Sequence, residues 1–271
     1  MQLKIREFEE FRSLVYETSG ISLGDGKESL VSSRIGKRMR ILGMEDFQTY
    51  LDCLRDGSEG DEMVHMLDAI STNTTSFFRE SEHFSFIRDT VTEWARKGRK
   101  RFRFWSAASS SGEEPYTLAM TLSECGFGAD TDTRILATDI STRILASARE
   151  GVYAQNKMGG LPPELIRKYF QPVRGSLPAS FAAQDRLKSM ISFQRLNLST
   201  PPFPMRGPMD LILVRNVMIY FDNEVRSRLL RECYRLLKPG GYLLVGHAES
   251  LTGLVKEFKC IRPSIYLKPG P

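Results

Sequence analysis

The sequence predicts an α/β protein with a mainly parallel sheet, preceded by a small all-helical domain. The first observation is that residues 1–70 carry helical periodicity throughout, with no strand pattern among them. The second is that short apolar runs alternate with helical segments after residue 100, which is typical of parallel strands buried by helices on both faces. The expected strands cover residues 101–107, 134–139, 190–195, 209–214 and 242–246.

Length and composition set the general class of protein. A chain of 271 residues has enough material for one large domain or two smaller ones. No apolar run approaches the ~20 residues of a transmembrane helix, and the first residues lack the apolar core of a signal peptide. The four cysteines lie far apart, as in a cytosolic protein with reduced thiols. We therefore expect a cytoplasmic protein, and its net charge of +5 hints at an acidic partner.

Three apolar stripes in the first seventy residues predict a small helical bundle. Each stripe repeats at helical spacing, and Gly20, Gly43 and Gly57 mark the expected helix ends. The stripes are Phe8, Phe11, Leu14 and Val15; Phe47, Tyr50, Leu51 and Leu54; and Met63, Met66, Leu67 and Ile70.

The helix expected at residues 27–42 differs from its neighbours in the charge of its outer face. Its apolar face is formed by Val31, Ile35, Met39 and Leu42. The opposite face is formed by four cations, Arg34, Lys37, Arg38 and Arg40. No acidic residue lies among them at the spacing that would pair with them along the helix. Such a face is either simply solvated or a docking surface for an acidic partner. Because unpaired cations repel one another, we predict that these four residues dock an acidic partner.

A stretch of small residues between an apolar strand and a helix, at 104–116, is the most informative part of the chain. Its sequence, FWSAASSSGEEPY, lets a ligand approach the backbone closely, and the helix start offers free N–H groups. Glu113 and Glu114 make this a poor phosphate site, and the dinucleotide motif GxGxxG is absent. Acid beside small residues suits a ligand with ammonium and hydroxyl groups, such as S-adenosylmethionine (AdoMet). An ordinary strand-to-helix turn is the alternative.

Polar side chains also follow the later strands, at the edge where parallel sheets bind ligands. Asp139 ends the second strand, 27 residues beyond Gly112, where an acid typically receives ribose hydroxyls. An acid at a strand end can equally cap the next helix. The strand at 209–214 is followed by Arg215 and Asn216.

Five motifs along the chain resemble, in order, those of the chemotaxis receptor glutamate methyltransferases, the CheR family of class I AdoMet-dependent methyltransferases. They are STNTTSFFRE (71–80), WSAASSSGEEPY (105–116), TDI (138–140), RNVMIYF (215–221) and GHAES (246–250). The resemblance implies a Rossmann-like sheet. It also implies a helical receptor-docking domain at 1–70, a linker contributing to the cofactor site at 71–80 and the methyltransferase domain at 81–271.

The resemblance also implies which residues contact AdoMet. They are Asn73, Thr75, Arg79, Glu114, Asp139, Asn197, Leu198, Arg215 and Asn216. The residue types agree with these roles, because the Glu114 carboxylate can bind the ammonium group and Asp139 the ribose hydroxyls. Asn197 and Leu198 follow the third strand, where an amide and an apolar face could hold adenine.

The acceptor that the resemblance implies is a glutamate side chain of a receptor, which becomes a methyl ester. Because this carboxylate is already ionised at pH 7, no general base is needed, and no metal is expected. Alignment of the reacting groups and removal of water should supply most of the rate. Arg79 and Tyr220 are the candidates to flank the methyl group and orient the carboxylate. The alternatives are that Asn73 and Thr75 only cap the linker and that Tyr220 is a core aromatic beside Phe221.

A small antiparallel β subdomain, inserted at about 172–193, is a further implication of the resemblance. In some members of the family it grips a peptide at the receptor's C-terminus through a glycine-rich loop. Here the corresponding stretch, GSLPA at 175–179, is poor in glycine, so the sequence leaves peptide binding open. We expect a monomer.

Two other functions compete with receptor methylation. A nucleic-acid methyltransferase could use the basic run at 96–103 to contact phosphates. Amino-group methyltransferases, however, need an Asp/Asn-Pro-Pro-aromatic turn after the fourth strand, where this chain has RNV at 215–217. A catalytically silent binding module would have lost the cofactor acids, yet Glu114 and Asp139 are both present. We therefore predict chemotaxis receptors as partners, with no nucleic acid and no insertion into the membrane.

Overall fold

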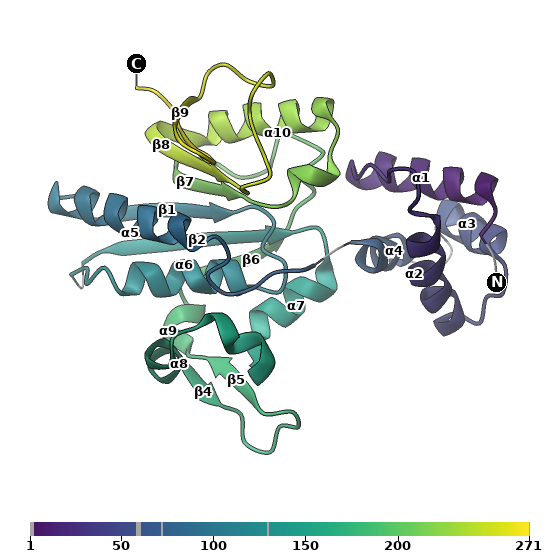
Figure 1. The fold of residues 1–271 in the computed structure, drawn as a ribbon, viewed down its shortest axis with the longest axis horizontal. Coiled ribbons are helices and arrows are strands. Elements are labelled where there is room, and N and C mark those ends of the chain that lie inside the picture. The colour runs from purple at the N-terminus through teal and green to yellow at the C-terminus, as the bar shows by residue number, and fades with distance from the viewer. Residues whose placement is uncertain (1–2, 58–60, 72, 129, 271) are drawn as a thin grey trace.

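The structure is a computed structural model that describes residues 3–57, 61–71, 73–128 and 130–270. Figure 1 shows a helical domain beside a larger sheet domain, joined by the extended segment after α4. The helices are α1 (Ile5–Ser19), α2 (Glu28–Ile41), α3 (Phe47–Asp56), α4 (Glu62–Ile70), α5 (Ser81–Arg96), α6 (Glu113–Ser123), α7 (Thr142–Glu150), α8 (Pro163–Tyr169), α9 (Asp185–Lys188) and α10 (Asn223–Leu236), with 3-10 helices η1 (Gln155–Gly160) and η2 (Met218–Tyr220). The strands are β1 (Arg101–Ser106), β2 (Asp132–Asp139), β3 (Val152–Ala154), β4 (Phe170–Pro172), β5 (Ser180–Ala183), β6 (Ile191–Arg195), β7 (Met209–Val214), β8 (Leu237–Val245), β9 (Lys259–Arg262) and β10 (Ile265–Leu267). Within the described ranges, no helix is long and apolar enough to cross a membrane.

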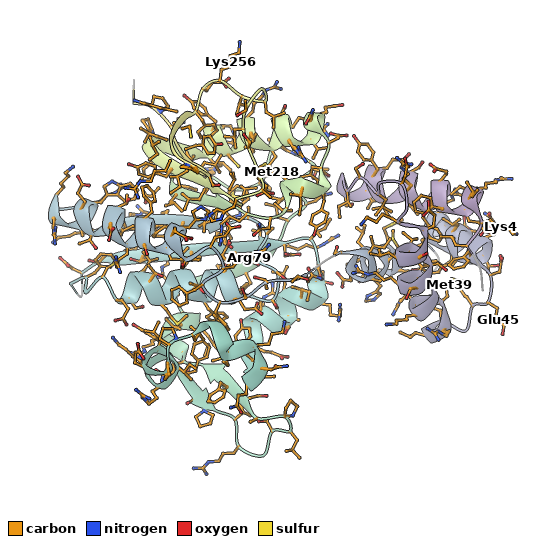
Figure 2. All side chains as sticks on the ribbon, in the orientation of Figure 1. Lys4, Met39, Glu45, Arg79, Met218 and Lys256 are labelled. Atoms are coloured by element: carbon orange, nitrogen blue, oxygen red, sulfur yellow. The ribbon has the colours of Figure 1, made fainter. Side chains whose placement is uncertain are left out.

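The helical domain packs α1 to α4 around one apolar core, as the three stripes predict. Phe11, Tyr50 and Met66, one from each stripe, are fully buried in it. Met39 from the apolar face of α2 joins them, and Figure 2 labels it inside this domain. Gly20 ends α1 with a φ of 72°, a left-handed conformation that favours glycine.

The main sheet has seven strands in the order β6-β2-β1-β7-β8-β10-β9. The strands from β6 to β8 pair in parallel, whereas β10 and β9 pair antiparallel at one edge. Alternate residues of β7 enter different cores. Leu211 and Leu213 pack with α5 and α6, whereas Ile212 and Val214 pack with α10. The sheet is therefore buried on both faces, as the alternation of strands and helices predicts.

A separate three-stranded antiparallel sheet, of order β3-β5-β4, confirms the expected β subdomain but corrects its bounds. Its strands lie between Val152 and Ala183, not within 172–193. The strand β6, which begins at Ile191, instead pairs in parallel with β2 of the main sheet. The first strand of the small sheet has three residues and directly follows α7, so it is too short to give a pattern in the sequence.

The antiparallel edge of the main sheet was not predicted. All four residues of β9 are exposed and β10 has only three residues, so neither forms an apolar run that marks a buried strand. β8 is longer than predicted because it begins at Leu237, five residues before the expected start at Tyr242. Its pairing with β7 shifts register, because Met209 pairs with Leu237 whereas Leu211 pairs with Tyr242.

The two domains touch at the carboxyl ends of the parallel strands. Ile21 forms an isolated antiparallel bridge with Phe221. The N–H of Ser22 donates to the carbonyl of Tyr220 at 2.8 Å. The segment after α1 is thereby held against the loop that follows β7.

Candidate functional site

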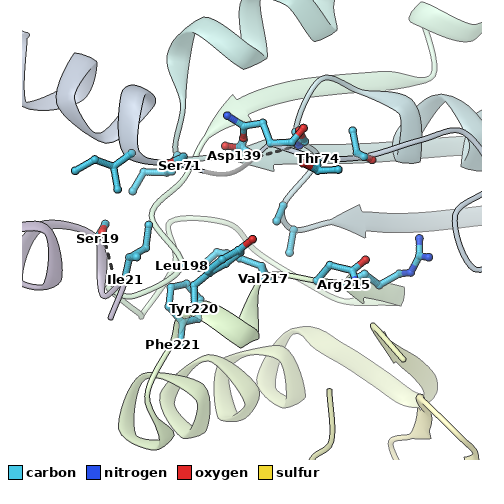
Figure 3. Close-up of a pocket in the computed structure, with 18 of the residues that line it drawn as sticks. Ser19, Ile21, Ser71, Thr74, Asp139, Leu198, Arg215, Val217, Tyr220 and Phe221 are labelled. Atoms are coloured by element: carbon cyan, nitrogen blue, oxygen red, sulfur yellow. Dashed lines mark hydrogen bonds between the residues drawn. The ribbon is translucent and has the colours of Figure 1, made fainter. Parts of the chain in front are cut away.

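A pocket of about 180 Å³ lies at the carboxyl ends of the parallel strands, with the segment 19–24 of the helical domain on one side (Figure 3). All ten residues predicted for cofactor binding or catalysis line it: Asn73, Thr75, Arg79, Glu114, Asp139, Asn197, Leu198, Arg215, Asn216 and Tyr220. The topology explains why they meet. Because β1, β2, β6 and β7 run in one direction, the loops that follow them lie at the same edge of the sheet.

The turn after β1 depends on two left-handed backbone conformations. Ser110 has a φ of 46° and Gly112 a φ of 97°. A Cβ at position 112 would lie 2.8 Å from the Tyr153 hydroxyl and 3.1 Å from the Cβ of Ala148, so only glycine fits there. The helix α6 begins directly after this glycine, with Pro115 as its third residue.

The two glutamates at the start of α6 have different environments. Glu113 is 1% exposed and accepts a hydrogen bond from the Ser111 hydroxyl at 2.6 Å. Glu114 lines the pocket, where it accepts from the Ser106 hydroxyl and from Nη1 of Arg215, each at 2.7 Å. Only Glu114 therefore offers its charge to a ligand.

Arg215 is the buried cation of the site, with 5% of its surface exposed. Besides contacting Glu114, it donates from Nη2 to Glu80 at 3.0 Å and to the carbonyl of Arg79. Burial favours a raised pKa for Glu80, but the charge of Arg215 and several hydrogen bonds hold this pKa below its usual range. The sequence reasoning missed Glu80, although it is the last residue of the linker motif at 71–80.

Asp139 is a buried carboxylate with unused acceptor capacity. Its Oδ2 accepts from the Ser110 N–H at 2.9 Å, and its Oδ1 accepts from the Ser141 N–H at 3.0 Å. Burial raises its pKa against the effect of these hydrogen bonds. Each carboxylate oxygen has about two acceptor positions, so one on each remains for ligand hydroxyls. The residue that caps α7 is Ser141, which accepts from the Ile144 N–H at 3.2 Å.

The side chain of Asn197 is largely engaged by the protein itself. Its Nδ2 donates to the carbonyl of Thr18 at 2.7 Å, so it links the loop after β6 to the helical domain. Its Oδ1 accepts from the N–H and the hydroxyl of Ser199 at 3.0 and 2.8 Å. One N–H of the amide remains for a ligand, beside the apolar surface of Leu198.

The predicted catalytic pair lies on the pocket wall. Nη1 of Arg79 donates to the carbonyl of Thr74 at 3.0 Å, and among the described residues Arg79 has no carboxylate partner. Figure 2 labels it close to the centre of the molecule. Tyr220 is half-buried with its ring toward the pocket in Figure 3, whereas Phe221 is 6% exposed and belongs to the core. The core position therefore belongs to Phe221 and not to Tyr220.

The two linker residues with a suggested capping role, Asn73 and Thr75, make no side-chain hydrogen bond within the described part of the chain. The backbone carbonyl of Asn73 accepts from the Ser110 hydroxyl at 3.1 Å, which holds the linker against the turn after β1. Both side chains are thus available to a ligand in the pocket.

Glu249 holds the loop after β7 and was also missed. It is 7% exposed, and its Oε2 accepts from the N–H groups of Asn216 at 2.8 Å and Gly246 at 2.7 Å. Its Oε1 accepts from the Ile219 N–H at 3.3 Å. Asn216 has a φ of 58°, so this strained loop relies on the carboxylate. Glu249 lies within the motif at 246–250, but its residue type alone does not indicate which backbone groups it binds.

Seven residues of the segment 19–30 in the helical domain also line the pocket, although the sequence did not predict this. They are Ser19, Ile21, Ser22, Leu23, Gly24, Lys27 and Leu30. The sequence marked this stretch only as the end of one helix and the start of the next. Figure 3 shows Ser19 and Ile21 across the pocket from Arg215.

The basic face of α2 is not an unpaired surface, which corrects one expectation. Arg38 forms a bidentate ion pair with Glu62 of α4, with Nε to Oε1 at 2.7 Å, and Glu62 is 3% exposed. Arg34 donates to the carbonyls at the end of α4, including that of Ser71 at 2.9 Å. Only Lys37 and Arg40 are exposed. The expectation rested on the lack of acids along the same helix. The partners of Arg34 and Arg38 come instead from α4 and the residue that follows it.

One group of donor atoms could hold a metal ion. Atoms of Glu80, His83 and His247 lie within 4.8 Å of one another. The oxygens of Glu80, however, already accept from Arg215, from Asn216 and from the His247 N–H. A cation there would compete with a guanidinium, so the expectation of no metal stays a prediction.

Known proteins match both domains of this chain. The all-alpha domain of CheR methyltransferases matches residues 6–71, and their SAM binding domain matches residues 73–267. A chemotaxis protein methyltransferase of Salmonella typhimurium is 36% identical over 266 residues, covering 98% of this chain and 91% of that protein. One of Borreliella burgdorferi is 37% identical over 269 residues, covering 97% and 94%. A probable chemotaxis protein methyltransferase of Rhizobium etli is 39% identical over 249 residues, covering 90% and 92%.

The parallel sheet, the small-residue turn and the acid-lined pocket at the carboxyl edge together define an AdoMet-dependent methyltransferase. Within this class, the chain belongs to the CheR methyltransferase family, because both of the family's domains match over nearly its whole length. The resemblance drawn from the five motifs is confirmed. So is the fold class, a mainly parallel sheet with an all-α domain before it and a small antiparallel sheet inserted.

Proposed function

We propose that the protein transfers the methyl group of AdoMet to glutamate side chains of methyl-accepting chemotaxis receptors. The products are glutamyl methyl esters and S-adenosylhomocysteine. The observation that carries this proposal is the composition of the pocket. It contains two acids suited to the cofactor, Glu114 and Asp139, and one cation, Arg79, that pairs with no carboxylate of the described residues. A carboxylate is the acceptor that such a cation attracts. The names of the similar proteins support the link to chemotaxis.

The donor set of the pocket fits AdoMet. Glu114 is suited to the ammonium group, Asp139 to the ribose hydroxyls and Leu198 to the adenine ring. When bound, AdoMet supplies a methyl group that an ionised carboxylate accepts as the carbon–sulfur bond breaks and its electron pair remains on sulfur. Arg79 would hold the acceptor carboxylate by a forked hydrogen bond, and the Tyr220 hydroxyl would donate to one of its oxygens.

No proton has to move in this reaction, because the acceptor is ionised at neutral pH. The work of the protein is therefore to align the acceptor and to exclude water. The segment 19–24 serves this purpose as a wall contributed by the helical domain, with apolar side chains such as Ile21 and Leu23.

The acceptor in this proposal lies on the cytoplasmic methylation helices of a receptor, so the enzyme would act in the cytoplasm. We expect it to act as a monomer. The domain limits follow the same scheme: docking by 1–70, a linker at 71–80 and methyl transfer by 81–271. Lys37 and Arg40 are the exposed cations of α2 available for an acidic receptor surface. Arg34 and Arg38 would hold α2 in place through their contacts with α4 and Ser71.

Radiolabelled AdoMet and receptor-containing membranes provide the test. Label should enter a receptor-sized band and should be released by mild base, because base hydrolyses methyl esters but not N-methyl groups. Base-stable label would point to methylation of an amine and contradict the proposal. The variant Asp139→Ala serves as the matched control, since it should lose labelling through weaker cofactor binding.

A further inference from the structure

A second hollow, of about 360 Å³, lies at the amino-terminal edge of the parallel sheet. Because β1, β7 and β8 run in parallel, their first residues meet at this edge, whereas the AdoMet pocket is at the other. Cations from three segments line it: Arg101 and Arg103 of β1, Arg206 of the loop before β7, and Lys238 of β8. We call this cavity, with Gly207, Pro208 and Met209 completing its wall, the basic hollow.

The cations around the basic hollow outnumber their acids. Six of them surround two carboxylates, Asp132 and Asp210; they are Arg99, Arg101, Arg103, Arg134, Arg206 and Lys238. Nζ of Lys238 lies 2.7 Å from Asp210, and Nε of Arg134 lies 3.3 Å from Asp132. Arg206 is exposed and has no ionic partner among the described residues. Four positive charges are therefore uncompensated, and they repel one another at this short range.

Lys238 lies partly buried among these cations. Burial, together with the nearby charges of Arg99, Arg101 and Arg103, lowers its pKa to about 8. The ammonium group is thus kept charged at neutral pH against the field of its neighbours. An anion bound in the hollow would reduce the repulsion between these cations.

We propose that the basic hollow binds a diphosphate group, either inorganic diphosphate or the diphosphate of a nucleotide. A guanidinium group can bind two phosphate oxygens at once, and Arg101 and Arg206 present their guanidinium groups to one cavity. Arg103 also lines the cavity, but its guanidinium donates to Asp132 and to the carbonyl of Phe102. The volume falls at the lower end of the range for small-molecule sites, roughly 300–1,000 Å³. None of these side chains lines the AdoMet pocket, so the hollow is a separate site.

The lining of the hollow favours a small anion over a nucleic acid. Proteins that bind single strands combine basic grooves with aromatic side chains that stack on the bases. Among the described residues that line the hollow, none is aromatic. The ligand is therefore held by charge and by its phosphate oxygens.

Isothermal titration calorimetry of the full chain with sodium pyrophosphate, at about 50 mM salt, tests the proposal. The wild type should show saturable binding to one site. Arg206→Glu should weaken this binding by about tenfold or more, because it replaces an attraction with a repulsion. Arg167→Glu is the matched control, since Arg167 is an exposed residue of α8 and the variant changes the net charge equally. Its affinity should equal that of the wild type.

Three further measurements decide the outcome. Saturating S-adenosylhomocysteine should leave the pyrophosphate affinity unchanged, whereas competition would place the anion in the AdoMet pocket and overturn the proposal. Absence of saturable binding, or equal weakening by both variants, would overturn it as well. Titration with ADP distinguishes the two sources, because tighter binding than pyrophosphate indicates a nucleotide and equal binding indicates the diphosphate alone. A single-stranded oligonucleotide that binds when pyrophosphate does not would assign the hollow to nucleic acid instead.

Discussion

At the scale of single residues, Asp139 has the most sharply defined role in the pocket. Both of its oxygens already accept a backbone N–H, and both keep an acceptor position for hydroxyls of a ligand, which we propose to be those of the ribose. Losing a charge-assisted hydrogen bond in a closed site costs roughly 1.5–3 kcal/mol, so Asp139→Ala should weaken AdoMet binding about tenfold to a hundredfold. Calorimetry measures this affinity directly.

Because Asp139→Ala also leaves two buried N–H groups unpaired, a second variant is needed. Asp139→Asn keeps an acceptor oxygen but removes the charge, and it should weaken binding less than the alanine variant does. Asp185→Ala, an exposed acid on α9, controls for net charge. A folded Asp139→Ala protein with wild-type affinity would remove the ribose assignment.

Arg79 and Tyr220 should affect turnover more than cofactor affinity, if they act on the reacting groups. Arg79→Ala removes the cation that would orient the acceptor, and Tyr220→Phe removes only a hydroxyl. Steady-state methylation kinetics, with AdoMet affinity measured separately, give the comparison. We expect kcat to fall by a larger factor than the affinity for AdoMet in both variants. Wild-type turnover in Tyr220→Phe would leave its ring with a purely structural role.

The sequence predicted the polar residues of the pocket but not those that support them. Glu114 and Asp139 could be found because they follow the ends of strands, where ligands of parallel sheets bind. Glu80 and Glu249 lie within recognised motifs, yet their roles depend on the loops they hold together. Glu80 contacts Arg215, which lies 135 positions away, and no local pattern reports such a contact.

At the scale of single elements, α2 combines a supporting role with an exposed one. Arg38 pairs with a buried carboxylate, Glu62, which also accepts from the Tyr50 hydroxyl at 2.6 Å. Burial opposes ionisation of Glu62, but the hydrogen bonds from Arg38 and Tyr50 lower its pKa overall. Lys37 projects from the same helix without a role in this network and is exposed.

The two groups of cations on α2 should therefore respond differently to substitution. Lys37→Ala with Arg40→Ala should raise the KM for receptor, and added salt should do the same to the wild type, because exposed charges are screened. Its thermal stability and AdoMet affinity should stay nearly unchanged. Arg38→Ala should instead lower the free energy of unfolding by about 2–3 kcal/mol, since it leaves Glu62 without its cation. An unaltered KM in the double variant at low salt would make the exposed face a solvated surface only.

Among the elements, the parallel strands could be predicted, whereas the antiparallel edge strands β9 and β10 could not. β7 is buried at every position, so its apolar run stands out in the sequence. β9 is exposed at every position and is held by its hydrogen bonds to β10, which leave no compositional mark. The small sheet depends on pairing between β3 and β5, and its limits follow from that pairing rather than from any local signal.

At the scale of the whole molecule, the candidate site forms where the two domains meet. The Tyr16 hydroxyl donates to Asp222 at 2.5 Å, and Asn197 donates to the carbonyl of Thr18. These partners lie 206 and 179 positions apart. The sequence predicted both domains from their periodicity, but contacts at such separations leave no trace in a single sequence. The pocket wall formed by residues 19–24 was missed for that reason.

The stability of the whole molecule should depend on pH through His83, a buried residue of α5. His83 is 1% exposed, and neither of its ring nitrogens has a hydrogen-bond partner within the described residues. Burial and the charge of Arg215 lower its pKa to about 4, although Glu80 opposes this shift. The ring is therefore neutral in the folded protein over a range of pH in which the unfolded chain takes up a proton.

The direction of the effect follows from this difference in proton binding. Stability from His83 is fully present above pH 6.5, the ordinary pKa, and is lost progressively as the pH falls toward about 4. Between pH 7 and pH 5 the loss should be about 2 kcal/mol, and urea unfolding at a series of pH values measures it. His83→Leu should reduce the slope over this interval, whatever its effect at pH 7, because the titrating group is gone. His65→Gln, at an exposed position of α4, should keep the wild-type slope. An unchanged slope in His83→Leu would mean that other groups, such as the buried carboxylates, set the acid sensitivity of the fold.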